Sequence, residues 1–413
     1  MTDLLGKPQT PSRNFRFYWI GTSVSFLGSN VTSTVIPLIA ALTLQASPLE
    51  LGLLVAAEVV PNLLAPLFAG PLVDRQKKRT ILISADLTRA VLIAAIPTLY
   101  FFDALSMSAL ILIGFAAGAF TVIGDTGSFS YVPELVPQDS LGKANSRLET
   151  SRSVAGVAGP GLGGSLAHAF SAPVALIVDA CSYVFSALCL LRVKHSEATS
   201  QESESGDPYF KLVSDGLKYV FRTPAIRLLA LGPASYNFFA GAVDATAVIY
   251  IVRELEISSS AYGFAMAFGA AGGVIGAWMS ERVRRLVGDR WALIGGIVVG
   301  STQPVLFALA GGHSILSLAV VTAGFFVNSA GITTYLVVGI TVRQTLIPRE
   351  MIGRAFSSMR ALSRGALPLG AVLGGLLASS MSLQTVLLLA GAGEFLVGVA
   401  YFKYRHYLPE HIS

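Results

Sequence analysis

The chain has 413 residues, of which 53% are hydrophobic and only 13% are charged. Soluble domains carry about 25% charged residues, so this composition excludes an ordinary soluble protein and leaves lipid as the medium for the apolar surface. The net charge of +5 does not indicate a nucleic-acid partner, because the basic residues lie in short runs between apolar stretches and form no single solvated patch.

The first half of the chain predicts a bundle of six membrane spans over residues 14–192. A polar tail, residues 1–13, precedes an apolar segment that is too long for the core of a signal peptide, so we expect this segment to persist as the first span. A span needs roughly 20 apolar residues. Runs of that kind lie at about 16–43, 51–73, 80–102, 106–131, 150–170 and 173–192.

The longest polar break, residues 193–222, predicts a cytoplasmic linker between two halves. Residues 195–208 are rich in Ser and Glu, which is typical of a disordered tether. Residues 209–222 place apolar side chains on one helical face, which predicts a short helix on the membrane surface.

Six further apolar runs predict a second bundle over residues 223–405, followed by a tail, residues 406–413. The runs lie at about 225–252, 260–281, 291–311, 314–342, 361–381 and 384–404. The whole pattern predicts an all-α membrane protein with twelve transmembrane helices in two six-helix bundles.

The basic residues predict that both termini are cytoplasmic. Cytoplasmic loops collect Lys and Arg, and with both ends inside, the inner loops, the linker and its flanks hold nearly all of them. We assign only Arg253 to an opposite loop and only Arg89 to a span. This distribution is typical of a multi-pass protein of the bacterial inner membrane.

The two halves repeat each other with an offset of 211 residues. The segment Leu135–Ser146 resembles Leu346–Ser357, and the match continues without a gap into the next helix. There, the glycines of the first half align with glycines of the second: Gly159, Gly163 and Gly164 with Gly370, Gly374 and Gly375.

A charged loop after the second span resembles a signature of the major facilitator superfamily. The loop runs from Gly70 to Arg79 and matches that signature at Asp74, Arg75, Lys78 and Arg79, with Lys77 in place of the usual internal glycine. The resemblance implies two six-helix bundles related by an axis normal to the membrane, with substrate bound between them near the midplane.

The fifth span carries Gly159-Pro160-Gly-Leu-Gly163-Gly164, which is similar to the end of the antiporter signature of drug exporters in this superfamily. Ala155 replaces a usual glycine, so the upstream part matches only partially. The wider pattern looks like the branch of macrolide, tetracycline and enterobactin efflux proteins. Small residues let helices approach closely, so we expect this helix at the interface of the halves; ordinary tight packing is the alternative.

The resemblance also implies a cytoplasmic gate. Asp74 would face the start of the eleventh helix, where exposed N–H groups favour an anion. Arg75 and Arg79 would pair with Asp125 on the fourth helix while the protein is open outward. The alternatives are that the cations only follow the positive-inside rule and that Asp125 binds substrate.

Acidic residues within spans are costly and rare. Asp86 lies one helical turn before Arg89, which predicts a structural ion pair. Asp244 and Glu58 each lie about 10–12 Å from the outer end of a span, and desolvation favours the protonated form of a carboxyl group. We therefore predict that one of these two carries a transported proton; a permanently hydrogen-bonded acid is the alternative.

Sparse polar groups on several spans predict a substrate cavity with aromatic walls. Such a cavity suits an amphiphilic molecule better than a sugar, and lipid-facing aromatic residues are the alternative. The candidates are Asn30, Thr34, Tyr236, Asn237, Asn328 and Tyr335.

These patterns predict proton-coupled export of an amphiphilic small molecule, such as an antibiotic, a siderophore or another secondary metabolite. The alternatives are lipid movement between leaflets on the same fold, and a receptor or assembly factor that does not transport. Neither a catalytic constellation nor a metal-ligand cluster is apparent, so we expect no enzyme activity, cofactor or metal. The expected partners are the substrate, protons and the bilayer, and we expect a monomer.

Overall fold

The computed structural model describes residues 13–194, 209–312, 314–348 and 351–410, and only the backbone of residues 64–75 and 209–213. Within these ranges the chain is almost entirely helical and contains no strand. The predicted tether at residues 195–208 lies outside the described residues.

The first half contains six membrane-crossing segments. Its elements are α1 (Arg13–Leu38) with the π-helix η1 (Ile39–Thr43), α2 (Pro48–Arg75), α3 (Lys78–Phe101), α4 (Met107–Leu135), the short η2 (Gln138–Ser140), α5 (Leu141–Ala169), and α6 (Ala172–Ala175) with α7 (Ile177–Leu191).

The second half has the same plan after the helix α8 (Tyr209–Arg222), which lies where the sequence predicted a short helix. Its elements are α9 (Pro224–Ile249) with the π-helix η3 (Tyr250–Glu254), α10 (Ser259–Gly300), α11 (Thr302–Leu309), α12 (Ile315–Leu346), α13 (Ile352–Leu377), α14 (Leu383–Lys403) and η5 (Arg405–Tyr407).

The prediction of twelve crossings is confirmed. Eight stretches of the described chain are long and apolar enough to span a membrane, and one of them, Ser259–Leu309, holds two crossings because the backbone turns at Gly288, where φ is 84°. The helices α2, α5 and α13 complete the set. The last two begin earlier than predicted, at Leu141 and Ile352, because a helix continues in water beyond the membrane, where hydropathy no longer marks it.

The internal repeat is visible in the backbone. The π-helices η1 and η3 are separated by the offset of 211 residues that the sequence indicated. The same offset relates Gln45 (φ 51°) to Glu256 (φ 49°), and it relates Ser47 to Ser258, the N-caps of α2 and α10. Each N-cap hydroxyl accepts a backbone N–H of the first helical turn, which fixes the same start for both helices.

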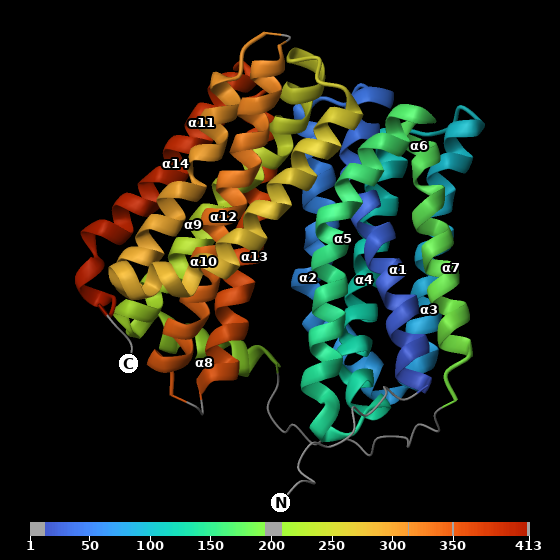
Figure 1. The fold of residues 1–413 in the computed structure, drawn as a ribbon, viewed down its shortest axis with the longest axis horizontal. Helices are drawn as coiled ribbons and strands as arrows, with labels where there is room; N and C mark the ends of the chain where they lie inside the picture. Colours follow the sequence, from blue (N-terminus) through green and yellow to red (C-terminus); the bar gives the residue numbers. More distant parts are fainter. Residues whose placement is uncertain (1–12, 195–208, 313, 349–350, 411–413) are drawn as a thin grey trace, which may run out of the picture.

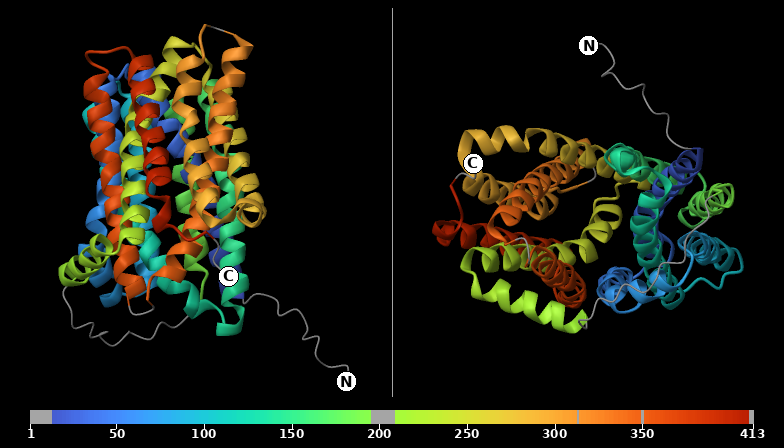
Figure 2. Two further views of the ribbon diagram at one scale, coloured as in Figure 1. Left: turned by 90° about the vertical axis from the view of Figure 1, so that its left-hand side faces the viewer. Right: turned by 90° about the horizontal axis from the view of Figure 1, so that it is seen from below.

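The two six-helix bundles lie side by side and separate toward the end that carries α8, the start of α1 and the end of α14 (Figures 1 and 2). The largest cluster of buried hydrophobic residues includes Leu51 and Ile251, and therefore joins both halves at the opposite end. Toward the terminal end each half has its own cluster, around Tyr18 in the first and Tyr401 in the second. The halves are thus packed together at one end and open at the other.

Candidate functional site

The interface between α5 and α10 is built from backbone in close approach. A Cβ atom added at Gly164 would lie 2.8 Å from the Cα of Gly263, closer than real Cβ atoms come to such a neighbour. Gly263 also faces the carbonyl oxygen of Pro160. The same helix uses Gly159 and Gly163 against α1 of its own half, beside Asn30 and Val31. The glycine-proline segment therefore packs on both halves.

The interface between α2 and α13 repeats this arrangement. A Cβ atom at Gly375 would lie 2.7 Å from the Cα of Leu49 on α2, and one at Gly374 would lie 2.5 Å from the Cα of Ala242 on α9. These glycines are the repeat partners of Gly164 and Gly163. Two equivalent glycine contacts thus close the same end of the molecule.

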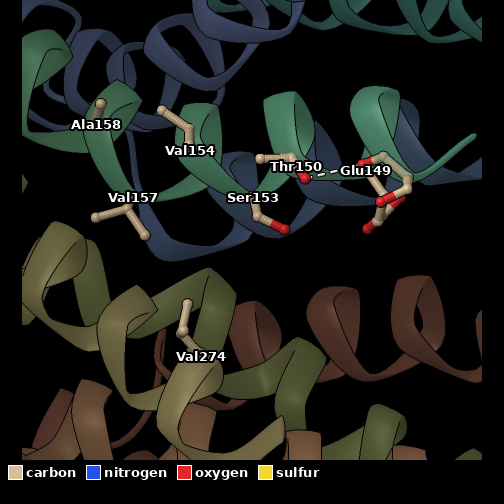
Figure 3. A pocket seen from close by; sticks show the side chains of 8 residues that line it. Glu149, Thr150, Ser153, Val154, Val157, Ala158 and Val274 are labelled. Carbon is tan, nitrogen blue, oxygen red and sulfur yellow. Dashed lines mark hydrogen bonds between the residues drawn. The ribbon is translucent and has the colours of Figure 1, made fainter. Parts of the chain in front are cut away.

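A cavity of about 660 Å³ opens between α5 and α10 on the terminal side of their glycine contact. In Figure 3, Val274 of α10 points toward Val157 of α5, and Thr150 and Glu149 lie farther along α5. Its lining combines polar and apolar side chains. The lining residues are Ser146, Glu149, Thr150, Ser153, Val154, Val157, Ala158 and Val274.

The two predicted proton carriers lie close enough to interact electrostatically across the junction of the halves. The half-buried side chain of Glu58, on α2, packs against Gly114 of α4, whereas Asp244, on α9, is an exposed residue that interacts electrostatically with Tyr262 of α10. Within the described chain no hydrogen bond or ion pair forms at either carboxyl group. Two acids from opposite halves therefore interact electrostatically, and neither has a cation in contact within the described chain.

Two other intramembrane acids, Asp86 and Asp179, have partners inside the first half. Asp86 and Arg89 form the expected ion pair, with the guanidinium 4.4 Å from the ring centroid of Tyr183. Asp179 accepts hydrogen bonds from Thr32 at 2.5 Å and from Ser182 at 2.9 Å. These contacts join α1, α3 and α7 inside the first half, which is a structural role.

A second polar cluster lies inside the second half. The Asn328 side chain donates to the Tyr236 hydroxyl at 2.7 Å and to the Gly300 carbonyl at 3.0 Å. Glu394 is 2% exposed, interacts electrostatically with Tyr236, and has one carboxyl oxygen without a hydrogen-bond partner. Tyr236 and Asn328 therefore bind each other inside one half.

Two of the predicted cavity residues are wrong for this conformation. Thr34 is 1% exposed and donates to the Asn30 carbonyl one turn earlier, at 3.1 Å. Tyr335 is 3% exposed, and its hydroxyl group bonds that of Tyr401 at 2.9 Å. Helical periodicity identifies a polar face but not the neighbour that covers it, and in lipid a polar group is satisfied by its own or an adjacent helix.

Asn30 and Asn237 are partly exposed but already bonded. The Asn30 amide donates to the Phe26 carbonyl at 2.8 Å. The Asn237 amide donates to the Ser363 carbonyl at 3.0 Å and hydroxyl at 2.9 Å, which joins α9 to α13 within one half.

The predicted cytoplasmic gate is only partly described. The side chains of Asp74 and Arg75 lie outside the described residues. Arg79 donates to the carbonyls of Leu190 and Leu191 at 2.8 and 2.6 Å, and so caps the end of α7. Asp125 is exposed on α4 and forms no ion pair within the described chain. The pairing of Arg75 and Arg79 with Asp125 therefore stays a prediction.

The prediction that Arg89 is the only basic residue inside a span is wrong. Arg343 is 7% exposed within α12 and donates to the Leu229 carbonyl at 3.1 Å. Arg360 and Arg364 lie on one face of α13, and both are exposed. The signal for this pair was their spacing of one helical turn at the start of the eleventh apolar run.

Arg364 joins the two halves. Its guanidinium donates to the side-chain oxygen of Asn62 on α2 at 3.1 Å. Beside this bond, a Cβ atom at Gly365 would contact Leu63 at 3.6 Å. The α2–α13 interface is therefore in contact at the level where the α5–α10 interface has opened into its cavity.

The chain matches a known family along nearly its whole length. Residues 8–412 match the family described as "Transmembrane secretion effector". The multidrug efflux pump Tap of Mycolicibacterium fortuitum is 25% identical over 390 residues, covering 90% of this chain and 91% of Tap. The uncharacterised MFS-type transporter YvqJ of Bacillus subtilis is 23% identical over 84% of this chain and 82% of its own length.

Solved transporters share the fold. The nucleoside transporter NupG superposes with a TM-score of 0.78 at 12% identity, covering 95% of this chain and 99% of NupG. A bacterial homologue of the iron transporter ferroportin, in an inward-facing state, gives 0.77 at 19% identity, covering 96% of this chain and 100% of its own. At these identities the likeness concerns the fold alone.

Proposed function

The chain belongs to the transmembrane secretion effector family of the major facilitator superfamily, and we propose that it exports an amphiphilic small molecule in exchange for protons. The observation that carries this proposal is the pair of unneutralised acids, Glu58 and Asp244, at the junction of the two halves. An acid in the membrane without a neighbouring cation is costly. Proton exchange explains why two such acids are retained at this place.

The mechanism is alternating access with competition. Asp244 is accessible in the state that is open at the terminal end, so it loses its proton there and the cavity takes up substrate. Closure at that end and opening at the other then expose the acids to outside protons, which favour release. Binding of one proton removes the repulsion between the two carboxylates, which links protonation to the approach of the halves.

We also propose that the termini are cytoplasmic and the membrane is a bacterial inner membrane, since the basic residues gather at the terminal end. The state described here is then inward-open, like the ferroportin homologue. Epitope tags at either terminus are expected to be inaccessible in intact cells.

Lipid movement between leaflets is the second candidate. It is favoured by the cavity between α5 and α10, which lies at an interface of two helices and is lined on one part by apolar side chains such as Val154 and Val157. Export of a water-soluble dye driven by a proton gradient would argue against it.

The test is transport in proteoliposomes with an imposed pH gradient. Asp244→Asn, Glu58→Gln and the double variant are compared with wild type, using a broad panel of drugs to find a transported compound. We expect loss of uphill transport in at least one single variant, with downhill movement retained. Uphill transport by the double variant would place the proton site elsewhere.

A further inference from the structure

We infer that Arg364 binds an anionic group of the exported molecule, at the α2–α13 interface. The inference rests on the proposed export function and names its substrate class: an amphiphile with a carboxylate, phosphate or sulfonate group. Its basis is a cation inside a membrane-spanning helix, held across the junction of the halves by a neutral partner.

The position of Arg364 is deep. Its partner Asn62 lies fourteen residues after the first residue of α2, about 21 Å along that helix from its outer end. The bond from guanidinium to amide oxygen, at 3.1 Å, is the only hydrogen bond that Arg364 makes in the described part of the chain. A guanidinium offers five N–H donors in a planar fork, so most of its donors remain available.

The charges around Arg364 do not neutralise it in contact. Arg360, one turn earlier on α13, repels it, while Asp125 of α4 attracts it without forming an ion pair. Charged groups at this depth are retained where they act on substrates or ions. Carboxylates and phosphates are the groups that bind a guanidinium in bidentate fashion, with roughly twice the strength of a neutral hydrogen bond.

The repeat allows the two interfaces between the halves to be compared at equivalent positions. The offset of 211 residues aligns Arg364 with Ser153 and Asn62 with Gly273. At that equivalent place on the α5–α10 interface the fold has no cation, and Ser153 lines the open cavity. The arginine is therefore not a feature of the repeated fold, and its charge is a property that distinguishes the α2–α13 interface.

The ligand is recognised because its anionic group takes the place of Asn62 as the partner of Arg364. An acidic group entering between the halves replaces the Asn62 oxygen at Arg364, exchanging a neutral acceptor for a charged one. The surroundings at Leu63 and Gly365 are apolar, so the rest of the ligand is expected to be hydrophobic.

The experiment measures equilibrium binding of two dyes to the purified full-length protein in detergent: a rhodamine with a free benzoate and the methyl ester of the same dye. We expect wild type to bind the carboxylate dye more tightly than the ester. Arg364→Gln is expected to weaken only the carboxylate dye, by about tenfold or more, since a hydrogen bond to a charged group is worth ~1.5–3 kcal/mol. Asn62→Asp gives Arg364 a carboxylate of the protein as its partner, so this variant is also expected to weaken only the carboxylate dye.

The control is Arg222→Gln, which removes an exposed cation from the end of α8. Size-exclusion profiles and thermal unfolding check that each variant is folded. The assignment would be overturned if wild type bound both dyes with equal affinity or bound neither dye. It would also be overturned if Arg364→Gln kept the preference of wild type for the carboxylate dye. The assay uses no proton gradient, so failure of proton coupling leaves its result unchanged.

A lipid headgroup shares this chemistry and is separated by a second arm. Binding is repeated in phosphatidylcholine nanodiscs with and without phosphatidylglycerol. An unchanged affinity for the carboxylate dye supports a small-molecule site. Loss of dye binding in the presence of phosphatidylglycerol, restored by omitting it, would assign Arg364 to an anionic lipid and overturn the proposal.

Discussion

The α5–α10 and α2–α13 interfaces begin alike and end differently. At the closed end, Gly164 faces the carbonyl oxygen of Ser259 and Gly375 faces that of Pro48, in positions related by the repeat. Toward the terminal end, α2 and α13 stay joined through Asn62 and Arg364, whereas α5 and α10 separate around a cavity of about 660 Å³. The glycine contacts that both interfaces share are what the fold needs in order to close. The stretches toward the terminal end, in which the interfaces differ, are where side chains with a specific function lie.

The same rule applies inside the bundles. The offset of 211 residues aligns the ion pair of Asp86 and Arg89 with Ile297 and Gly300, and aligns Tyr183 with Glu394. The backbone repeat therefore persists while the buried polar groups have diverged. Glycine contacts are constrained by geometry in both halves, but charges are constrained only where one half uses them.

The largest expected effect comes from breaking what the interfaces share. Leu in place of Gly164 and Gly375 would put a side chain where even a Cβ atom is too close, and overpacking costs about 1–3 kcal/mol at each site. The closed end can no longer pack, so transport should fall by at least about tenfold and the population should shift to the outward-open state. Transport in proteoliposomes and spin-label distances between the halves measure both.

Gly142→Leu is the matched control, since no atom lies within 4 Å of a Cβ placed at Gly142 of the same helix α5. Wild-type spin-label distances in the double Leu variant would contradict the account of the closed end.

A smaller but specific effect is expected at the charged end of α2 and at the equivalent place in α10, just before its turn at Gly288. Asp74 aligns with Arg285 in the repeat, so the gate signature occurs in one half only. Asp74→Asn should strongly reduce efflux without affecting membrane insertion, because it removes the anion that the resemblance places at the start of α13. Arg285→Gln should leave most efflux, as Arg285 is exposed and pairs with Glu281 of its own helix at 2.8 Å. Drug susceptibility of cells expressing each variant, with expression checked by immunoblot, provides the measurement; equal activity of the two would remove the asymmetry.

Sequence patterns predicted the fold more completely than the site. Hydropathy located the crossings and the glycine alignment located the repeat, because both depend on local composition. The rarity of acids within spans also singled out Glu58 and Asp244, each on its own. Their mutual approach required tertiary structure: nothing in the chain indicates that α2 and α9 bring these carboxyl groups together.

Polar residues without charge were predicted less well for a physical reason. Thr34 bonds its own helix, and Tyr335 bonds Tyr401. A hydroxyl or amide group is readily satisfied by a nearby carbonyl, so its presence in a span does not indicate a cavity. Arg364 was missed as a basic residue inside a span, although it lies within the predicted run at about 361–381.

The smallest expected effect is a rescue that transfers the difference between the interfaces. Ser153→Arg, introduced into the Arg364→Gln protein, puts a guanidinium at the repeat-related position on α5, facing the cavity instead of Asn62. The new cation is more solvated than the original and lacks the amide on the opposite helix. The binding free energy that it adds for the carboxylate dye should therefore be that of an exposed charge pair, about 0.2–1 kcal/mol. Affinity for the carboxylate rhodamine should therefore recover up to about fivefold over Arg364→Gln. Ser153→Gln in the same background should give no recovery, and the methyl ester should bind equally to all three proteins. Recovery with Gln, or equal gains for ester and acid, would mean that the substitution acts through cavity shape, and the charge difference between the two interfaces would then carry no recognition.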